Sequence, residues 1–126
     1  MNSQRQIKVL VVEDDESIRA LYVMKLAQEG FVALTANDGL QGLEVAEKQR
    51  PDLILLDLRM PRMSGDEMLA TLRATDWGSS MRVIILTNIS KNEAPHALRF
   101  LSVDRYVTKV HHTPAQIVGI VREILA

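Results

Sequence analysis

The sequence predicts an α/β fold in which helices cover both faces of a parallel sheet. Two observations lead to this prediction. Short runs of Val, Ile and Leu recur along the chain, and such runs are typical of strands that are buried on both faces. Longer stretches between these runs repeat apolar residues at helical spacing. Strands that alternate with helices over short connections form right-handed βαβ units, so the strands are expected to be parallel.

Five strands are predicted, at residues 7–12, 31–35, 53–56, 83–86 and 104–108. The first, third and fourth contain almost only Val, Ile and Leu, which indicates burial on both faces of the sheet. The fifth strand, DRYVT, is more polar, which favours a position at the edge of the sheet.

Five helices are predicted to follow these strands. Apolar spacing indicates four of them, at residues 18–26, 40–46, 66–74 and 117–125. A polar cap at Asp38 begins the second helix, and Thr113 followed by proline begins the last. The fourth helix is expected to be short and to end near Leu101. Ser90 and Glu93 have the pattern of a capping box, but Pro95 would then fall past the first turn of the helix. A later start with Asn92 as the cap would place Pro95 more comfortably.

The size and composition of the chain limit its function. Its 126 residues suffice for one domain, so we expect a single domain over residues 1–126 with no output domain. The net charge of -1 gives no general attraction to nucleic acid or to membranes. The absence of cysteine excludes disulfides and a Cys-based zinc site. No apolar run could span a bilayer, and the polar start lacks the apolar segment of a signal peptide, so a cytoplasmic location is expected.

The stretch 53–65, LILLDLRMPRMSG, is the centre of the sequence. Asp57 directly follows a buried strand, and Pro61 and Gly65 then prevent the strand from continuing. The carboxylate is therefore expected in a loop at the carboxyl end of the strand, where open α/β sheets bind their ligands. The alternative is that Asp57 caps a helix or forms a turn, but the residues just after it do not begin a helix cleanly.

Polar residues follow four of the predicted strands. Glu13 and Asp14 follow the first strand, Asp57 the third, Thr87 the fourth and Lys109 the fifth. Taken singly, Thr87 could be a turn residue and Lys109 a solvated amine, but all five positions lie at strand ends. If these ends converge, two carboxylates at 4 Å repel by about 4 kcal/mol at an effective dielectric near 20. A hard divalent cation, Mg²⁺ first, would relieve this repulsion.

This set of residues suits the chemistry of phosphoryl transfer. A metal ion bridging Asp14 and Asp57 would leave one oxygen of Asp57 available as a nucleophile. The metal ion, Lys109 and Thr87 could then neutralise and hydrogen-bond an incoming phosphoryl group.

The chain resembles the receiver domain of bacterial response regulators over essentially its full length. The ordered set that carries the resemblance is Glu13-Asp14 after LVV, Asp57 in LLDLRMPRMSG, Thr87 in VIILTN, Tyr106 in RYVTK, and Lys109. The resemblance implies a flavodoxin-like (βα)5 three-layer sandwich with sheet order 2-1-3-4-5. It also implies that Asp57 accepts a phosphoryl group from a histidine kinase or a phosphotransfer protein.

The resemblance further implies roles for the neighbouring residues. The implied Mg²⁺ ligands are Asp14, Asp57 and the backbone carbonyl of Arg59, with Glu13 acting through water. Thr87 and Lys109 would bind the phosphoryl oxygens. In this family the threonine moves toward the phosphate and the ring at Tyr106 turns inward, although this ring could also simply pack on an edge strand. The surface that changes is formed by the fourth helix, the fifth strand and the fifth helix.

The resemblance also implies the partners. A downstream protein target is expected, and a weak homodimer could form through the same surface. Neither direct nucleic-acid binding nor a membrane partner is expected. Apart from its own phosphorylation and dephosphorylation, no enzymatic activity is implied.

The chain departs from the family pattern after Lys109, where Val110 replaces the usual proline. A cis bond before a residue other than proline costs about 3–4 kcal/mol, so a trans bond and a rearranged loop are predicted. His111-His112 in this loop could ligate a metal ion, but a solvated pair is the preferred interpretation.

Two further positions bear on helix ends and on the phosphate. Ser102-Val103 stands where Gly-Ala is common in the family, which suggests a different helix end. Arg59 and Ile89 lie two residues beyond Asp57 and Thr87, at positions that in this family control how water reaches the phosphate. Bulky Ile89 predicts slow self-dephosphorylation.

Three alternatives stay open. A phosphatase of the haloacid dehalogenase type usually needs a second Asp two residues after the nucleophile, but Arg59 occupies that place. A pseudo-receiver that only binds proteins should lack the acid pair or the acceptor, and this chain has both. The chain could also be a receiver domain excised from a longer regulator or from a hybrid kinase.

Overall fold

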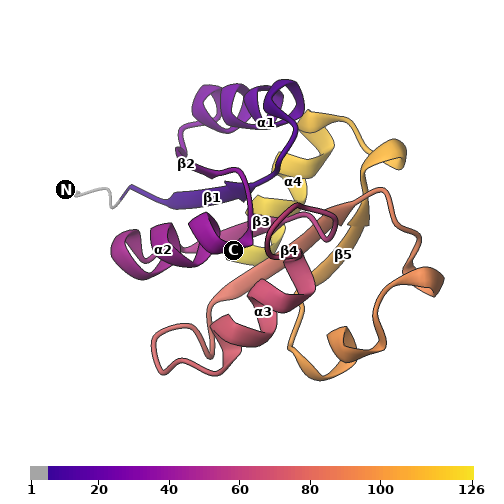
Figure 1. Ribbon diagram of the computed structural model, residues 1–126. Coiled ribbons are helices and arrows are strands. Elements are labelled where there is room, and N and C mark those ends of the chain that lie inside the picture. The colour runs from indigo at the N-terminus through magenta and orange to yellow at the C-terminus, as the bar shows by residue number, and fades with distance from the viewer. Residues whose placement is uncertain (1–5) are drawn as a thin grey trace.

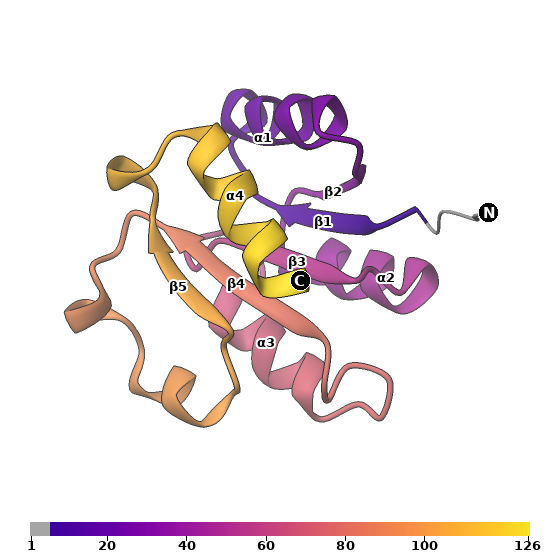
Figure 2. The same ribbon diagram turned by 180° about the vertical axis from the view of Figure 1, so that it is seen from behind.

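The computed structural model describes residues 6–126 as a five-stranded parallel sheet between two layers of helices (Figures 1 and 2). The strands are β1 Lys8–Val12, β2 Val32–Ala36, β3 Leu53–Leu56, β4 Arg82–Thr87 and β5 Arg105–Thr108. The α-helices are α1 Glu16–Gln28, α2 Gly39–Gln49, α3 Gly65–Arg73 and α4 Pro114–Leu125. The sheet order is β2-β1-β3-β4-β5, which confirms the predicted topology and the edge position of β5. Most of the polar start, residues 1–5, lies outside the described residues.

Each strand contributes alternate residues to two separate cores. Val9 and Val11 of β1 pack with α1 and α4 on one face, whereas Leu10 and Val12 pack with α2 and α3 on the other. Figure 1 shows α2 and α3 in front of the sheet, and Figure 2 shows α4 in front of the opposite face. All four residues of β3 are buried, as expected for a strand covered on both sides. The three-layer sandwich is thus confirmed.

The strand register brings the functional loops to one edge of the sheet. Val12 pairs with Leu56, and Thr87 pairs with Thr108, so these strands end at the same level. Glu13, Asp57 and Lys109, the next residues in three of these strands, therefore emerge along one edge, called here the carboxyl edge.

Each α-helix begins with a side-chain cap. Asp15 accepts the N–H of Ile18 at the start of α1, and Asp38 accepts the N–H of Gln41 in α2. Capping boxes begin α3 at Ser64 and α4 at Thr113. Such caps satisfy backbone N–H groups that have no partner within the helix.

The prediction of an α-helix between the fourth and fifth strands is wrong. Two short 3₁₀ turns, η1 Lys91–Glu93 and η2 His96–Phe100, occupy this segment. Ala94 separates them in an extended conformation with φ -69° and ψ 152°, because the ring of Pro95 disfavours helical geometry in the residue before it. The predicted end near Leu101 is correct.

Arg73 at the end of α3 anchors this β4–β5 segment. Its guanidinium donates to the carbonyls of Leu101 and Ser102, and also to those of Gly78 and Met81, at 2.7–2.8 Å. Ser102 has φ 54°, a left-handed conformation that fits a position where the family often has glycine. The segment is thus tied to α3 rather than closed by a helix of its own.

The turn after β5 follows the predicted trans geometry. No cis peptide bond occurs in residues 6–126, and Lys109–His111 form a 3₁₀ turn, η3. His112 follows this turn and contacts the residues at its start. Its N–H donates to the carbonyl of Lys109, and its Nδ1 lies 3.0 Å from the carbonyl oxygen of Thr108.

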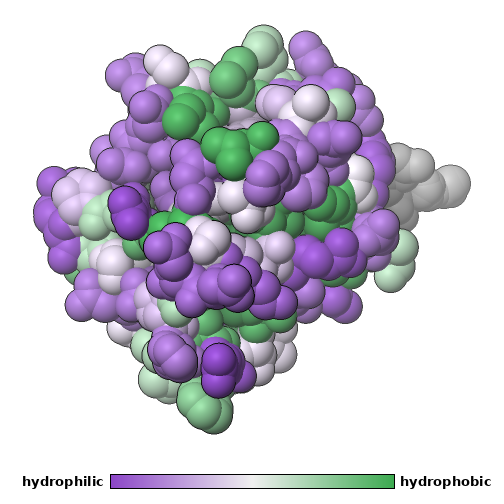
Figure 3. Space-filling view, turned by 90° about the vertical axis from the view of Figure 1, so that its right-hand side faces the viewer, coloured by the Kyte–Doolittle hydropathy of each residue, from purple (hydrophilic) through white to green (hydrophobic). Residues whose placement is uncertain are grey.

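Figure 3 views the side on which the β4–β5 segment and the turn after β5 lie in Figure 1. The surface there is mostly hydrophilic, with small separate apolar patches. None of the helices described between residues 6 and 126 has the length and apolarity that crossing a bilayer requires.

Candidate functional site

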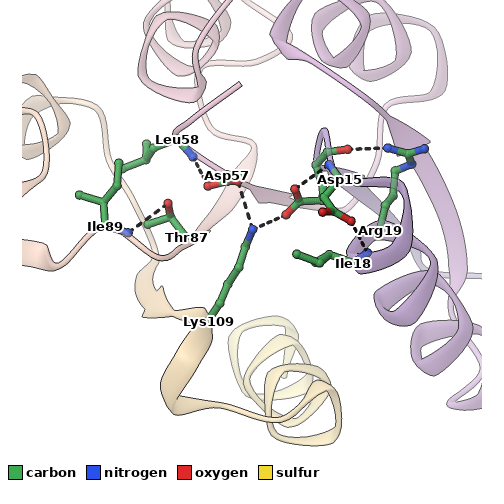
Figure 4. Close-up of polar contacts among 9 residues, drawn as sticks. Asp15, Ile18, Arg19, Asp57, Leu58, Thr87, Ile89 and Lys109 are labelled. Atoms are coloured by element: carbon green, nitrogen blue, oxygen red, sulfur yellow. Dashed lines mark hydrogen bonds and ion pairs between the residues drawn. The ribbon is translucent and has the colours of Figure 1, made fainter. Parts of the chain in front are cut away.

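Lys109 links two acidic residues at the carboxyl edge (Figure 4). Its ammonium group donates to Asp57 Oδ2 at 3.1 Å and to Glu13 Oε1. At most 9% of each of these three side chains is exposed. Three elements distant in sequence therefore place a buried cation between two buried anions, as the strand-end pattern predicted.

The turn after β1 holds Glu13 in place. The second oxygen of its carboxylate, Oε2, accepts the N–H of Asp15 at 3.0 Å. Its backbone carbonyl accepts a hydrogen bond of 2.7 Å from the Arg19 guanidinium of α1. Because Asp15 also caps α1, the acidic turn and the helix fix each other.

The loop after β3 holds Asp57. Its Oδ1 accepts the N–H of Leu58 at 2.7 Å, so each carboxylate oxygen has one partner. The chain then returns, and the N–H of Gly65 donates to the Leu58 carbonyl at 2.9 Å. A Cβ atom at residue 65 would lie 2.0 Å from the Asp57 carbonyl oxygen. Only glycine permits this approach, which explains the glycine eight residues after Asp57.

Asp14 completes a group of three carboxylates. Glu13, Asp14 and Asp57 each offer one oxygen, and these atoms lie within 4.8 Å of one another. Asp14 is exposed, whereas the other two are buried. Oxygen ligands without His or Cys suit Mg²⁺ or another hard cation that keeps part of its water shell. The carboxylates predicted as metal ligands are therefore close enough to share one ion.

Burial and charge set the protonation of the buried pair. Burial lowers the pKa of Lys109, but the hydrogen bond that its ammonium donates to Glu13 and the charge of Asp57 outweigh this effect, so the pKa of Lys109 is raised. Burial raises the pKa of Glu13, and the hydrogen bond from Lys109 only partly opposes this. The ammonium group therefore stays protonated at neutral pH and offsets the negative charge around it.

Thr87 and Tyr106 meet at Ile89. Thr87 is 1% exposed at the end of β4, and its Oγ1 accepts the N–H of Ile89 at 3.5 Å. Tyr106 donates its hydroxyl to the carbonyl oxygen of Ile89 at 2.6 Å, and burial raises the pKa of this phenol. One residue thus contacts both side chains that the family resemblance connects with switching.

A family model decides the identity of this site. The model of the response regulator receiver domain matches residues 9–122. The chain belongs to this family. As a receiver domain it is a response-regulator module of two-component phosphorelay signalling.

Similar proteins include longer regulators. The receiver domain is 41% identical over 80 residues to sporulation initiation phosphotransferase F of Bacillus subtilis, covering 64% of this chain and 63% of that protein. It is 35% identical over 119 residues to the alkaline phosphatase synthesis transcriptional regulatory protein PhoP of the same species, covering 94% of this chain and 48% of that protein. The chain thus spans less than two thirds of these curated relatives.

Solved structures show the same fold. Chemotaxis protein CheY4 of Vibrio cholerae matches with a TM-score of 0.87 and 27% identity, covering 95% of this chain and 99% of that one. The receiver domain of sensor histidine kinase PA1611 from Pseudomonas aeruginosa matches with a TM-score of 0.86 and 25% identity, covering 97% and 100%. That structure has a magnesium ion coordinated in its active site cleft.

Sequence reasoning missed two supports of the receiver-domain site. The capping box of Ser64 and Glu67 was visible as a Ser followed three residues later by Glu, next to the loop that holds Asp57. The contact between Arg62 and Asp38 had no such signal, because the two residues are 24 positions apart.

Proposed function

We propose that this receiver domain is a Mg²⁺-dependent phosphoacceptor. Asp57 would take a phosphoryl group from the phosphohistidine of a histidine kinase or a phosphotransfer protein. The observation that carries the proposal is the position of the buried Asp57, 3.1 Å from the Lys109 ammonium and grouped with two further carboxylates. A nucleophile, a fixed cation and a set of oxygen ligands are the parts that phosphoryl transfer needs.

The proposed transfer needs no further reactant. An oxygen of the Asp57 carboxylate attacks the phosphorus atom, the P–N bond of phosphohistidine breaks, and its electron pair stays on the imidazole. The product is an acyl phosphate. Lys109 offers its ammonium to the phosphoryl oxygens. Thr87 can donate its hydroxyl hydrogen to them, since its contact with Ile89 uses only an oxygen lone pair.

The proposed ligands of Mg²⁺ are Asp14, Asp57 and the backbone carbonyl of Arg59, with Glu13 acting through water. A bound ion would neutralise charge on the incoming phosphoryl oxygens. The three carboxylates fit this role, because their ligand atoms converge and because they are hard oxygen donors.

We further propose that the domain is a switch and not an enzyme that turns over substrates. Arg59 stands where a haloacid dehalogenase-type phosphatase needs its second Asp. The proposed output is binding to a downstream protein, without direct contact to nucleic acid or membrane. The surface for this partner, or for a weak homodimer, is formed by the β4–β5 segment, β5 and α4. In this surface the β4–β5 segment takes the place of the fourth helix that the sequence predicted. A cytoplasmic location stays a prediction.

The receiver domain could also belong to a longer regulator. The chain matches 101 residues of hybrid signal transduction histidine kinase D of Dictyostelium discoideum at 36% identity, only 6% of that protein. Such a setting would change the partner but not the chemistry proposed for Asp57.

Acetyl phosphate with Mg²⁺ tests the proposal. Intact-mass spectrometry should show one added phosphoryl group. This group should not be added when Mg²⁺ is chelated before acetyl phosphate, or when the protein carries Asp57→Asn. Asp76→Asn, which removes an exposed carboxylate in the loop after α3, is the matched control and should label normally. Labelling that persists in Asp57→Asn would identify another acceptor. Turnover of phosphoesters would instead indicate a phosphatase, and no reaction would indicate a pseudo-receiver.

The lifetime of the adduct is a separate expectation. Ile89 is half-buried beside Thr87, where its bulk would hinder water from reaching the phosphate. We expect slow loss of the phosphoryl group from the purified domain. Loss within seconds would contradict this role of Ile89.

A further inference from the structure

We infer that Arg62 and Asp38 are positioning residues for the metal site, because together they clamp the loop between β3 and α3 to the start of α2. The inference rests on the proposed function, in which the backbone carbonyl of Arg59 in this loop binds Mg²⁺. Neither Arg62 nor Asp38 is a member of the cluster of three carboxylates, Glu13, Asp14 and Asp57.

The clamp is a short, charged contact. Arg62 Nε donates to Asp38 Oδ2 at 2.6 Å, and Nη2 of the same guanidinium donates to the same oxygen. Asp38 is 2% exposed and also accepts the N–H of Gln41 through Oδ1 at 2.8 Å. A buried carboxylate needs hydrogen-bonded and charged partners of this kind. Arg62 is the only ion-pair partner of Asp38 among residues 6–126, and its exposed side chain covers Asp38 from the solvent side.

The backbone reinforces the same contact. The N–H of Gly39 donates to the Met63 carbonyl at 3.2 Å, and a Cβ at residue 39 would lie 2.7 Å from that oxygen. Arg62 itself has φ 65°, in the left-handed region that is costly for a residue with a side chain. Arginine stands at this position despite the cost of its backbone conformation, and its side chain makes the contact with Asp38.

The loop is therefore fixed at two places. At its base, Gly65 donates to Leu58, next to Asp57. At its tip, Arg62 and Met63 are bound to the first residues of α2. Arg59 lies between base and tip, so the direction of its carbonyl depends on both contacts. Release of the tip would leave the carboxylates in place but loosen this one ligand.

Arg62→Gly separates positioning from simple structural support. Glycine adopts a positive φ without strain, so the loss of the side chain should be partly offset in thermal stability. Loss of the clamp should nevertheless weaken Mg²⁺ binding about tenfold, the low end of what outer partners of metal ligands contribute. A role in stability alone would leave Mg²⁺ affinity unchanged.

The experiment measures Mg²⁺ affinity by titration calorimetry and, without metal, amide hydrogen exchange of Gly39. Arg62→Gly and Asp38→Asn should both weaken Mg²⁺ binding, and Arg62→Gly should speed the exchange of Gly39. Arg62→Lys, which keeps the charge, should recover part of the affinity. Arg122→Gln is the matched control, because it removes two exposed hydrogen bonds to Glu29 far from the loop.

The outcomes distinguish this inference from the proposed function. If the unmodified domain binds no Mg²⁺, the proposed function fails and the inference fails with it. If the unmodified domain binds Mg²⁺ and Arg62→Gly binds it equally well, only the inference is overturned. Equal weakening in Arg122→Gln would likewise overturn it, because the effect would then not come from the clamp.

Discussion

Lys109→Met should strongly destabilise the domain in the absence of Mg²⁺. Methionine keeps most of the length of the lysine side chain but removes its charge. The change leaves Glu13 and Asp57 as two buried carboxylates without the cation that lies between them. The substitution thus tests whether the charge of Lys109, rather than its packing, holds the site together.

The structure sets the size of the effect. An ammonium and a carboxylate 3.1 Å apart attract by about 5 kcal/mol at an effective dielectric of about 20. The variant no longer buries an ammonium group, which returns part of this energy. Removal of one member of a buried ion pair costs about 3–5 kcal/mol, a large share of the roughly 5–15 kcal/mol that stabilises a typical domain.

Urea unfolding at several pH values measures this loss. In Lys109→Met the carboxyl group of Glu13 should bind its proton more tightly when folded than when unfolded, because burial raises its pKa and Lys109 no longer opposes this. The folded state then holds more protons, so the stability of the variant should fall as pH rises from about 5 to 8. Mg²⁺ should restore stability, by about 2.7 kcal/mol at one hundred times its dissociation constant.

Lys109→Met/Asp57→Asn is the control for the charge argument. It removes one anion together with the cation, and it should be more stable than Lys109→Met alone. If Lys109→Met unfolds at the same urea concentration as the unmodified domain, without Mg²⁺ and at neutral pH, the electrostatic reasoning is refuted.

Three further predictions concern the supports of the site. Gly65→Ala should lower the free energy of unfolding by about 1–3 kcal/mol or more and slow labelling of Asp57, because its Cβ would meet the Asp57 carbonyl. Gly119→Ala is the control, because a Cβ there would have no heavy atom within 4 Å, and it should stabilise α4 by about 1 kcal/mol. Equal urea midpoints for Gly65→Ala and Gly119→Ala would contradict the clash at Gly65. The Gln41 N–H, and then Arg62, lower the pKa of Asp38. The stability that this carboxylate contributes is therefore complete above the ordinary pKa of 3.8, and it is lost as pH falls through the lowered pKa. The difference in urea midpoint between the unmodified domain and Asp38→Asn should therefore shrink in acid, and a difference independent of pH would disprove this. Arg73→Met should cost about 3 kcal/mol and speed hydrogen exchange in the β4–β5 segment, because four backbone carbonyls lose a charged donor; unchanged exchange there would show that Arg73 does not anchor it.

The sheet and the ionisable site could be predicted because they depend on few rules. Parallel strands end at one edge, so the residues after LVV, LILL and RYVT had to meet there. That reasoning places Glu13, Asp57 and Lys109 correctly, without reference to any side-chain contact.

The β4–β5 segment could not be predicted as readily. Ser90 and Glu93 have the pattern of a capping box, but in the structure the Ser90 hydroxyl donates to the Glu93 carboxylate and caps no backbone N–H. Pro95 then limits η1 to one turn. The outcome depends on competition between a weak cap and one proline, and on anchoring by Arg73 from another helix, which no local pattern contains.

The supports of the carboxyl edge differ in strength, and this difference bears on how a signal would leave the site. The turn after β1 is fixed by Asp15 and Arg19, and the loop after β3 by its base and by the clamp at Arg62. The end of β4 is held more loosely. There the contact of Thr87 with Ile89 is 3.5 Å long, and the following segment has no α-helix.

Ile89 therefore connects the proposed phosphate site with the outer surface. Movement of Thr87 toward a phosphoryl group on Asp57 would break its contact with the Ile89 N–H, while the carbonyl of the same residue accepts from Tyr106 at 2.6 Å. A shift of this backbone would release or redirect the phenol without disturbing the better-fixed loops. Arg73 anchors the far end of the segment at Leu101 and Ser102. The 3₁₀ turns between Ile89 and this anchor have poorer hydrogen-bond geometry than α-helix, so a change of shape would cost least there. The 3₁₀ turns that stand in place of a helix between β4 and β5 thus lie where the proposed function needs a change of shape, beside Thr87 and away from the proposed metal ligands.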